Sequence, residues 1–332
     1  MRGMIQKDYP YMYARVSAKR AKLYDSSDYE NMLKMGPNEI SRKMEEGKYK
    51  KDINELGSEY DGVQLVELAL ARNLAREMSE LAEMANGKLQ KVIESYLRKY
   101  DVLTYKRILR AKKAGEEDFE DMLTPVGGID YEKVQELEDS TFEEVKNQIQ
   151  FEDSEIDYQY YIEDAETLAD IESGLDQAYY DEISLVAQNS GSSALRDFVN
   201  EEIEYENLKM ALRMKRYDLP REEIEKRLLV EENGSIVKEV LNRDFEDALS
   251  YVITELGLNV ESQIESVEHA IEVHRLENAL RKLHTQPLGL PSILGYVVAK
   301  ITEIKNLRML LRAKETGIQN QETIRKQLVL PN

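Results

Sequence analysis

Apolar side chains recur every three or four positions through most of the chain, which is the period of an α-helix buried on one face. In the last long segment they fall at Ile301, Ile304, Leu307, Leu310 and Leu311. Arg312 and Lys314 follow in the last turn, where cations oppose the negative end of the helix dipole, and Gly317 is a suitable stop. The pattern therefore predicts a long terminal helix with a basic end.

The same period predicts other long helices along the chain. They cover residues 62–84, 88–114, 194–217 and 261–283, with a basic helix at 11–24. Glycine and proline at 286–292 predict a rigid connector before the terminal helix. The chain has only 16 glycines and 7 prolines, and few stretches alternate with period two. These features together predict an all-α protein.

A motif in the terminal helix occurs three times. The last copy reads Glu-x-x-Asn-Leu-x-x-Leu-Leu-Arg-Ala-Lys from Glu303, a second begins at Glu204, and a weaker one begins at Asp101. The copies start about 100 residues apart. This near-constant spacing indicates a chain built from three like units.

Other features repeat with the motif. An aromatic–glutamate pair is expected to begin a helix in each unit, at Tyr29-Glu30, Phe142-Glu143 and Phe245-Glu246. A glutamate stands about one hairpin upstream of each motif, at Glu67, Glu172 and Glu268. We therefore divide the chain into three homologous helical repeats, at residues 1–125, 126–231 and 232–332.

Each repeat is large enough to bury a core of its own, unlike the small units of a solenoid. We expect three like domains of long helical hairpins and short helices, arranged about a pseudo-threefold axis or in a short arc. A threefold arrangement would leave a central depression lined by three equivalent helix ends.

The basic residues that end the three motifs are the candidate partner contacts. They are Arg110, Lys112, Arg213, Lys215, Arg312 and Lys314. One interpretation is that they complement the helix dipole and pair with acidic residues of their own hairpin. The other is that three basic ends surround a socket, in an otherwise acidic protein, that receives an acidic partner shaft.

The charge of the chain restricts its partners. With 65 acidic and 45 basic residues, the formal net charge is −20. Phosphates of nucleic acids and anionic lipid head groups would be repelled, so membrane association is expected to go through a protein partner. No stretch approaches 18 consecutive apolar residues, and the N-terminus lacks the apolar segment of a signal peptide. We expect a cytoplasmic protein with no transmembrane segment.

No catalytic or cofactor-binding constellation is found in the sequence. Cysteine is absent, and the histidines at 269, 274 and 284 lack the spacing of a metal pair. No phosphate-binding loop or nucleophile elbow occurs. The acidic run Asp153-x-Glu155-x-Asp157 lacks the glycine and distal glutamate of a calcium loop. We predict a non-catalytic protein without metal or cofactor.

The triplicated unit and its motifs resemble a known family. The opening Tyr11-x-x-Ala14-Arg15-Val16 and the ending that runs from Glu303 to Lys314 are similar to the C subunit of the archaeal-type (A-type, or V-type) ATP synthase, a relative of the d subunit of vacuolar ATPases. The resemblance covers nearly the whole chain. It implies a funnel of three helical domains that is a non-catalytic rotor part of the central stalk.

The resemblance also implies partners and a location. One mouth of the funnel would hold the rotor axle of subunits D and F, and the other would rest on the membrane proteolipid ring. The protein would be peripheral, at the cytoplasmic face of the cell membrane, and would transmit torque for ATP synthesis or hydrogen-ion transport.

Two other functions share some of these features. A soluble helical scaffold or adaptor with three repeats fits the composition but requires no proteolipid ring. An all-α enzyme, such as a metal-dependent hydrolase, would need carboxylates and histidines three or four residues apart on one helix face, and no such set is found.

Overall fold

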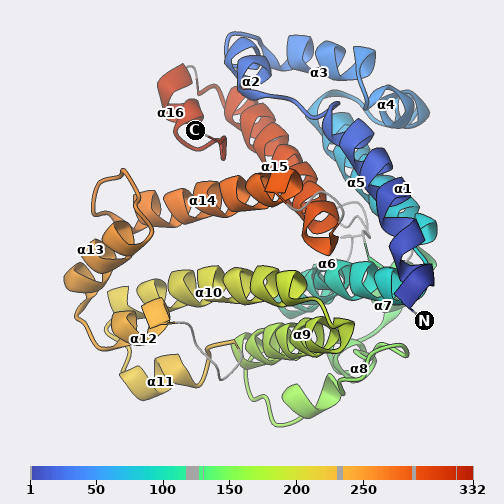
Figure 1. Ribbon diagram of the computed structural model, residues 1–332. Coiled ribbons are helices and arrows are strands. Elements are labelled where there is room, and N and C mark those ends of the chain that lie inside the picture. Colours follow the sequence, from blue (N-terminus) through green and yellow to red (C-terminus); the bar gives the residue numbers. More distant parts are fainter. Residues whose placement is uncertain are drawn as a thin grey trace. The chain divides into compact units, whose positions relative to one another are not determined.

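The computed structural model describes residues 2–116, 127–129, 131–229, 235–285, 289–318 and 320–331 (Figure 1). The described part is all-helical and contains no strand, as the sequence predicts. Its helices are α1 (Arg2–Arg20), α2 (Ser26–Met32), α3 (Pro37–Glu46), α4 (Lys50–Leu56), α5 (Gly62–Met84), α6 (Lys88–Ala114), α7 (Tyr131–Asp139), α8 (Phe142–Asn147), the 3-10 helix η2 (Gln159–Tyr161), α9 (Leu168–Ser190), α10 (Ser193–Arg216), α11 (Arg221–Glu225), α12 (Ser235–Leu241), α13 (Phe245–Glu255), α14 (Ile264–Thr285), α15 (Leu290–Glu315) and α16 (Gln321–Arg325).

The long helices agree closely with the hydrophobic pattern. Helices α5 and α6 have the predicted bounds, and α10 differs from its predicted range by one residue at each end. Left-handed glycines follow α6, α9 and α15, at Gly115, Gly191 and Gly317. Glycine adopts this conformation without steric cost, so it ends a helix cleanly.

Helix α1 differs most from the prediction of a helix at 11–24. It starts at Arg2, contains Pro10, and ends at Arg20. The early end has a local cause, because Asp25 and Asp28 form a capping box that starts α2. Tyr29-Glu30 consequently lies inside α2 rather than at its start, whereas Phe142 and Phe245 begin α8 and α13 as expected.

The last two long helices also start away from their predicted positions. Helix α14 starts at Ile264, three residues after the predicted 261. Helix α15 starts at Leu290, so Pro291 belongs to its first turn rather than to a connector. Proline is tolerated there because the first helical N–H groups have no acceptor within the helix. Residues 286–288 of the predicted connector lie outside the described residues.

The chain divides into two compact units. The first comprises Met1–Asn86 and Leu276–Asn332, and the second comprises Gly87–Arg275. The repeat boundaries predicted at 125/126 and 231/232 fall outside the described residues, so the three-repeat division remains a sequence prediction. None of the described helices has the length and apolar character needed to cross a membrane.

In the first unit, α15 packs against α5, α1 and α3, and α4 packs against α3 and α5 (Figure 1). Leu70 and Met78 of α5 and Tyr296 and Leu311 of α15 are completely buried. Helix α15 is therefore the central helix of this unit, although only α16 follows it among the described helices.

In the second unit, α9 packs against both α6 and α10, and α10 packs against α12 and α13. Buried side chains of α10 to α14 form one apolar cluster, which includes Leu208, Leu212, Val237, Leu249 and Val267. The motif helices α6 and α10 thus each contribute a face to the core.

Gly174 marks the closest approach between α9 and η2. A Cβ atom at this position would lie 2.2 Å from the carbonyl oxygen of Tyr161 and 3.1 Å from Cγ2 of Ile162. Contacts that short do not occur between real atoms, so no larger residue fits without movement of the backbone.

Gly174→Ala should therefore destabilise the protein by about 2 kcal/mol, because overpacking outweighs the usual helical advantage of alanine. Urea denaturation would measure the change, with Gln188→Ala, on an exposed position of the same helix, as the control. A variant as stable as the wild type would contradict this close contact.

Candidate functional site

The three motif helices, α6, α10 and α15, place their arginines in the same way. Arg110, Arg213 and Arg312 have side chains that are 59%, 62% and 65% exposed. Each uses Nε and Nη2 to donate to both oxygens of one glutamate, which is Glu172, Glu268 or Glu67 respectively. This bidentate geometry fixes the orientation of both side chains.

The glutamates are the three that the sequence shows upstream of the motifs, but each arginine pairs with a glutamate of another hairpin. Arg110 of α6 pairs with Glu172 of α9, and Arg213 of α10 pairs with Glu268 of α14. Arg312 of α15 pairs with Glu67 of α5. The expectation that each arginine pairs within its own hairpin is therefore wrong.

The lysines of the motifs follow the same order. Lys112 donates to the carbonyl oxygen of Glu138. Lys215 donates to that of Arg243 at 2.5 Å, and Lys314 donates to that of Leu33 at 2.7 Å. Each acceptor lies at the carboxyl end of a short helix (α7, α12 or α2) of the next repeat, where carbonyl groups lack helical partners.

The acidic first residue of each motif has a third equivalent contact. Asp101 accepts the N–H groups of Gly128 and Ile129 at 2.9 and 3.0 Å. Glu204 accepts the N–H of Ile236 at 3.3 Å. These N–H groups lie at or just before the start of the next repeat's first short helix.

In the third copy, Glu303 accepts the N–H of Tyr24 at 2.7 Å, just before α2. Burial raises the pKa of the Asp101 and Glu204 carboxyls, and their backbone N–H donors partly offset this rise. We call the acid, the arginine and the lysine of one motif, with their partners, a junction clasp.

The sequence shows these acids as part of a repeated motif but does not indicate what they bind. Gly127 illustrates why, because a glycine in the sequence does not indicate which side chain lies close to it. A Cβ atom there would lie 2.2 Å from Oδ1 of Asp101, so glycine lets the backbone close around the carboxylate.

The asparagine of the motif binds the backbone of a segment that comes later in the sequence, just after α11 or α16. Asn207 exchanges two hydrogen bonds with the backbone of Leu229, at 2.9 and 2.8 Å. Asn306 does the same with Val329, at 2.8 and 2.9 Å. In the weaker first copy, Thr104 replaces asparagine and bonds back to Tyr100 of its own helix.

A groove lies beside Arg213 in the second unit. It has a volume of about 560 Å³ and is lined by α9, α10 and the segment after them. Its wall combines Met210, Met214 and Leu219 with Tyr217, which is 76% exposed. Charges of both signs also line it, so the groove offers apolar and polar contacts together.

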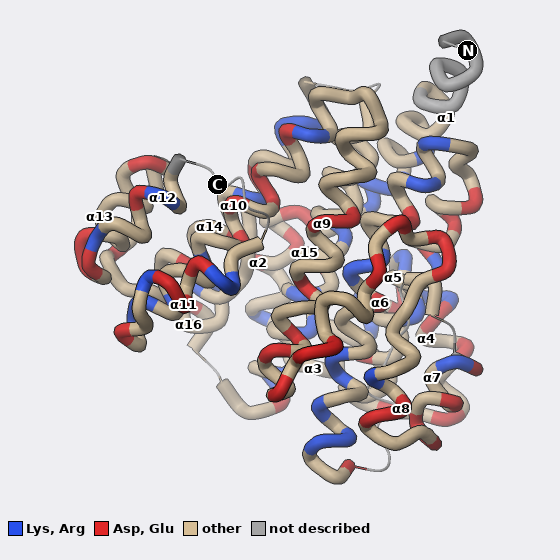
Figure 2. Tube along the Cα trace, turned by 90° about the horizontal axis from the view of Figure 1, so that it is seen from below, with Lys and Arg blue, Asp and Glu red and all other residues tan. Residues whose placement is uncertain are grey.

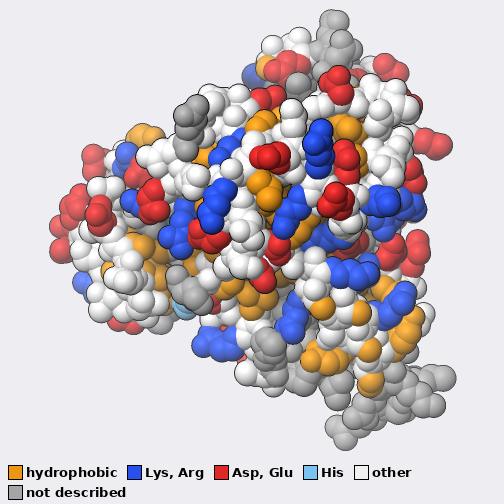
Figure 3. Space-filling view, turned by 90° about the horizontal axis from the view of Figure 1, so that it is seen from above, with side chains coloured by type: hydrophobic (Ala, Val, Ile, Leu, Met, Phe, Trp, Pro, Cys, Tyr) orange, Lys and Arg blue, Asp and Glu red, His pale blue; other side chains and the backbone are white. Residues whose placement is uncertain are grey.

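Charged residues of both signs are spread along the helices, as the trace in Figure 2 shows. Basic, acidic and apolar side chains are also interspersed on the molecular face seen in Figure 3. The six candidate cations are therefore not bare charges in an acidic protein, since each has an intramolecular partner.

Beneath this groove, a network of charges joins α6, α10 and α14. Lys99 and Arg275 contact Glu202 at 3.2 and 2.8 Å, and Lys209 contacts Glu206 at 2.9 Å. Burial by itself would raise the pKa of Glu206, but Lys99, Lys209 and Arg275 outweigh it and hold the pKa well below 4.5. The network therefore keeps Glu206 ionised.

The acidic run Asp153-x-Glu155-x-Asp157 is occupied by protein contacts. Asp153 pairs with Arg98 at 2.7 Å and Glu155 pairs with Lys91 at 2.5 Å, whereas Asp157 accepts the N–H of Gln159. The described residues contain no group of three potential ligands that could hold a metal ion.

Glu206→Gln should lower the free energy of unfolding by about 2 kcal/mol at pH 7, since the bonds of an ionised group are lost. A lowered pKa adds stability above the ordinary value of 4.5 that disappears as pH falls through the folded-state pKa. The difference from wild type should therefore shrink below pH 4.5 in urea titrations. A difference that stays constant with pH would contradict this account. Glu166→Gln, at an exposed position outside the network, is the control.

The clasp and the asparagine should differ in their effect on stability. Asn207→Ala leaves two buried backbone groups without partners, so we expect a loss of about 3 kcal/mol. Arg213→Ala removes an exposed ion pair and should cost about 0.5–1 kcal/mol. Urea denaturation of both variants measures this contrast. Equal losses of stability would mean that the exposed ion pair contributes more to the free energy of unfolding than its exposure predicts.

Comparison with known proteins agrees with the resemblance seen in the sequence. Residues 12–327 match the family model described as ATP synthase (C/AC39) subunit. The chain is 32% identical to the C subunit of the A-type ATP synthase of Methanococcoides burtonii, over 97% of this chain and 94% of that protein. It is 30% identical to the proteins of the same name from Haloferax volcanii, over 96% and 97%, and Methanosarcina acetivorans, over 97% and 93%.

Proposed function

Because this chain belongs to the ATP synthase (C/AC39) subunit family, we propose that it is a non-catalytic rotor protein in the central stalk of a V/A-type ATP synthase. It links the axle of subunits D and F to the membrane proteolipid ring. In this position it transmits torque for ATP synthesis or ion transport.

The observation that carries the proposal is the junction clasp, which occurs three times with one geometry. A part that transmits torque has to resist twisting, so neighbouring helices must be bonded at more than one position along their length. Each motif helix bonds the next repeat through its acid near the middle and through its arginine and lysine near the end. Sliding of one helix along the other would break all of these bonds together.

The cyclic order of the clasps supports a division of the chain into three repeats. Repeat 1 holds repeat 2, repeat 2 holds repeat 3, and repeat 3 holds repeat 1. We propose that residues 1–125, 126–231 and 232–332 are the three homologous repeats of a pseudo-threefold funnel.

The net charge of −20 and the absence of a spanning helix among the described residues favour attachment to the membrane through protein contacts. We place the protein at the cytoplasmic face of the membrane, as a peripheral part of the complex.

The motif ends are our proposed contacts with the axle. The clasp uses Nε and Nη2 of each arginine, and the arginine side chains are still about three-fifths exposed. An arginine has five N–H donors, so a partner carboxylate can bond the outer edge while the clasp remains closed. The same set of proposed contacts includes Arg110, Lys112, Lys215 and Lys314. The groove beside Arg213 would receive apolar side chains of the partner.

The double variant Arg213→Glu and Arg312→Glu should bind the D and F axle at least about tenfold more weakly, because like charges replace complementary ones. A pull-down with the axle and circular dichroism of the free protein provide the measurements. Arg221→Glu with Arg325→Glu is the matched control, since both arginines are also about half exposed and ion-paired.

A charge swap distinguishes the loss of a contact with the axle from the loss of the ion pairs within the clasp. Adding Glu268→Arg and Glu67→Arg to the double variant restores both ion pairs with reversed polarity. We expect recovered stability without recovered axle binding. Recovered binding, or binding that never fell in a variant of unchanged helicity, would refute the proposed contact.

A further inference from the structure

The first unit contains a cavity that the proposed axle contacts do not use. It has a volume of about 620 Å³ and lies where the end of α1, the turn before α4, and α5 meet. Its lining residues are Lys19, Lys22, Leu23, Tyr24, Gly47, Lys48, Arg76, Glu77 and Glu80. Four cations and two carboxylates therefore line one cavity in a chain of net charge −20.

The two carboxylates of the lining are already neutralised. Glu80 pairs with Lys19 at 2.7 Å and with Arg76 at 3.2 Å. Glu77 accepts the hydroxyl of Tyr296 and lies 3.6 Å from the completely buried ammonium group of Lys300. An anion entering the cavity would thus meet carboxylates whose charge is balanced.

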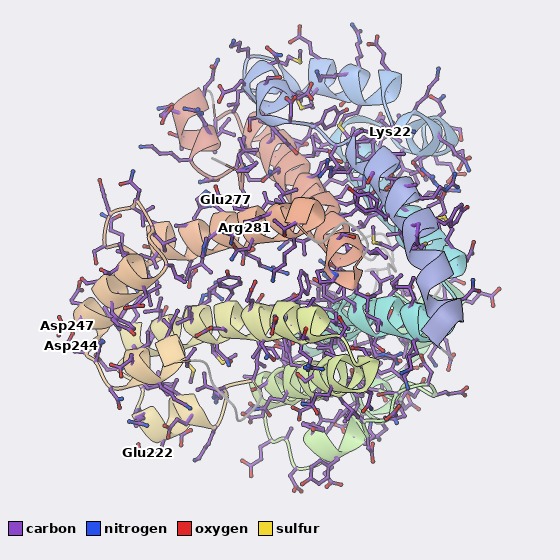
Figure 4. The ribbon with its side chains drawn as sticks, viewed as in Figure 1. Lys22, Glu222, Asp244, Asp247, Glu277 and Arg281 are labelled. Atoms are coloured by element: carbon purple, nitrogen blue, oxygen red, sulfur yellow. The ribbon has the colours of Figure 1, made fainter. Side chains whose placement is uncertain are left out.

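Lys22 and Lys48 are the two cations of the lining that form no ion pair with Glu77 or Glu80 among the described residues. The ammonium group of Lys22, which Figure 4 labels just beyond α1, has no ion-pair partner among the described residues. Lys48 is 10% exposed, pairs with Glu303, and lies 4.4 Å from the centre of the Tyr24 ring. Burial lowers the pKa of Lys48 to about 8 although Glu303 opposes the change, so a further anion would favour its charged form.

Tyr24 contributes a hydroxyl that lacks a partner. Its oxygen is buried and makes no hydrogen bond to any described residue. Burial, with Glu303 and Asp28 nearby, raises the pKa of Tyr24 well above its usual value, so the hydroxyl stays protonated and can donate. A buried hydroxyl without a partner is unfavourable by about 1–3 kcal/mol, and a ligand oxygen would remove that cost.

Gly47 allows this arrangement. A Cβ atom at this position would lie 3.3 Å from the Tyr24 hydroxyl and 3.5 Å from the carbonyl oxygen of Lys43. Glycine therefore leaves room beside the hydroxyl where a larger residue would crowd it.

We propose that this cavity binds a phosphate group, held by Lys22, Lys48 and the hydroxyl of Tyr24. Phosphate offers several acceptor oxygens, which suits a cavity whose lining includes two lysines and a tyrosine hydroxyl without a partner. The volume lies within the range of small-molecule pockets and exceeds what one phosphate fills. The group is either free phosphate or part of a small phosphate monoester.

The expected structural effect is local. Bound phosphate would connect the segment after α1 to the turn before α4, and through Lys48 and Glu303 to α15. This site is independent of the axle contacts, so its test does not depend on the proposed rotor function.

The test uses the full-length chain with inorganic phosphate or adenosine monophosphate as probe, at constant ionic strength set with chloride. Isothermal titration calorimetry gives affinity, and thermal unfolding gives the change in Tm. We expect saturable binding with a raised Tm, and at least about tenfold weaker binding in Tyr24→Phe and in Lys22→Gln. Lys34→Gln removes an equally exposed lysine outside the cavity and should bind as the wild type does.

The two probes distinguish the source of the phosphate group. Tighter binding of the monophosphate identifies a phosphate monoester, and equal binding identifies free phosphate. The proposal is overturned if neither probe binds beyond the effect of chloride, or if Tyr24→Phe and Lys22→Gln bind as tightly as Lys34→Gln.

Discussion

The fold depends on contacts that each motif helix makes with elements outside its own hairpin. The acid of each motif accepts backbone N–H groups beside a short helix, and its arginine pairs with a glutamate of another long helix. These partners lie as far as 279 residues apart in sequence, so no motif helix completes its polar contacts within its own hairpin. The same kind of interaction recurs in all three copies of the motif.

The parts of a clasp contribute unequally to stability. The arginine–glutamate pairs are exposed on the arginine side, and such pairs add little in water. Buried contacts such as those of Asn207 and Glu303 leave backbone groups or charges unsatisfied when they are broken. The buried parts of each motif therefore stabilise the fold most, whereas the exposed arginine pairs fix the orientation of their side chains.

Two networks of buried charge in this protein are balanced by contacts from several helices. Lys300 is completely buried and contacts Glu77, Glu303 and Tyr49. Glu206 is held ionised by cations of α6, α10 and α14. These networks require fixed geometry, since a small shift would leave a charge unpaired in a poorly solvated place.

The sequence by itself determined the helices, the repeated motif and the family. Hydrophobic period located α5 and α6 to the residue, because an amphipathic face is a local property. Local pattern failed at α1 and at the start of α15, where a capping box and a first-turn proline set the boundaries. The motif spacing and the resemblance identified the same family as the match to known proteins.

Only the tertiary structure decided which residues meet. The sequence shows Glu67, Glu172 and Glu268 as repeated features. It does not indicate which acidic residue pairs with Arg312. Ion pairing depends on distance in space, and the packing of α15 beside α5 creates that proximity. The cavity around Tyr24 likewise arises where separate segments converge, so no local pattern could reveal it.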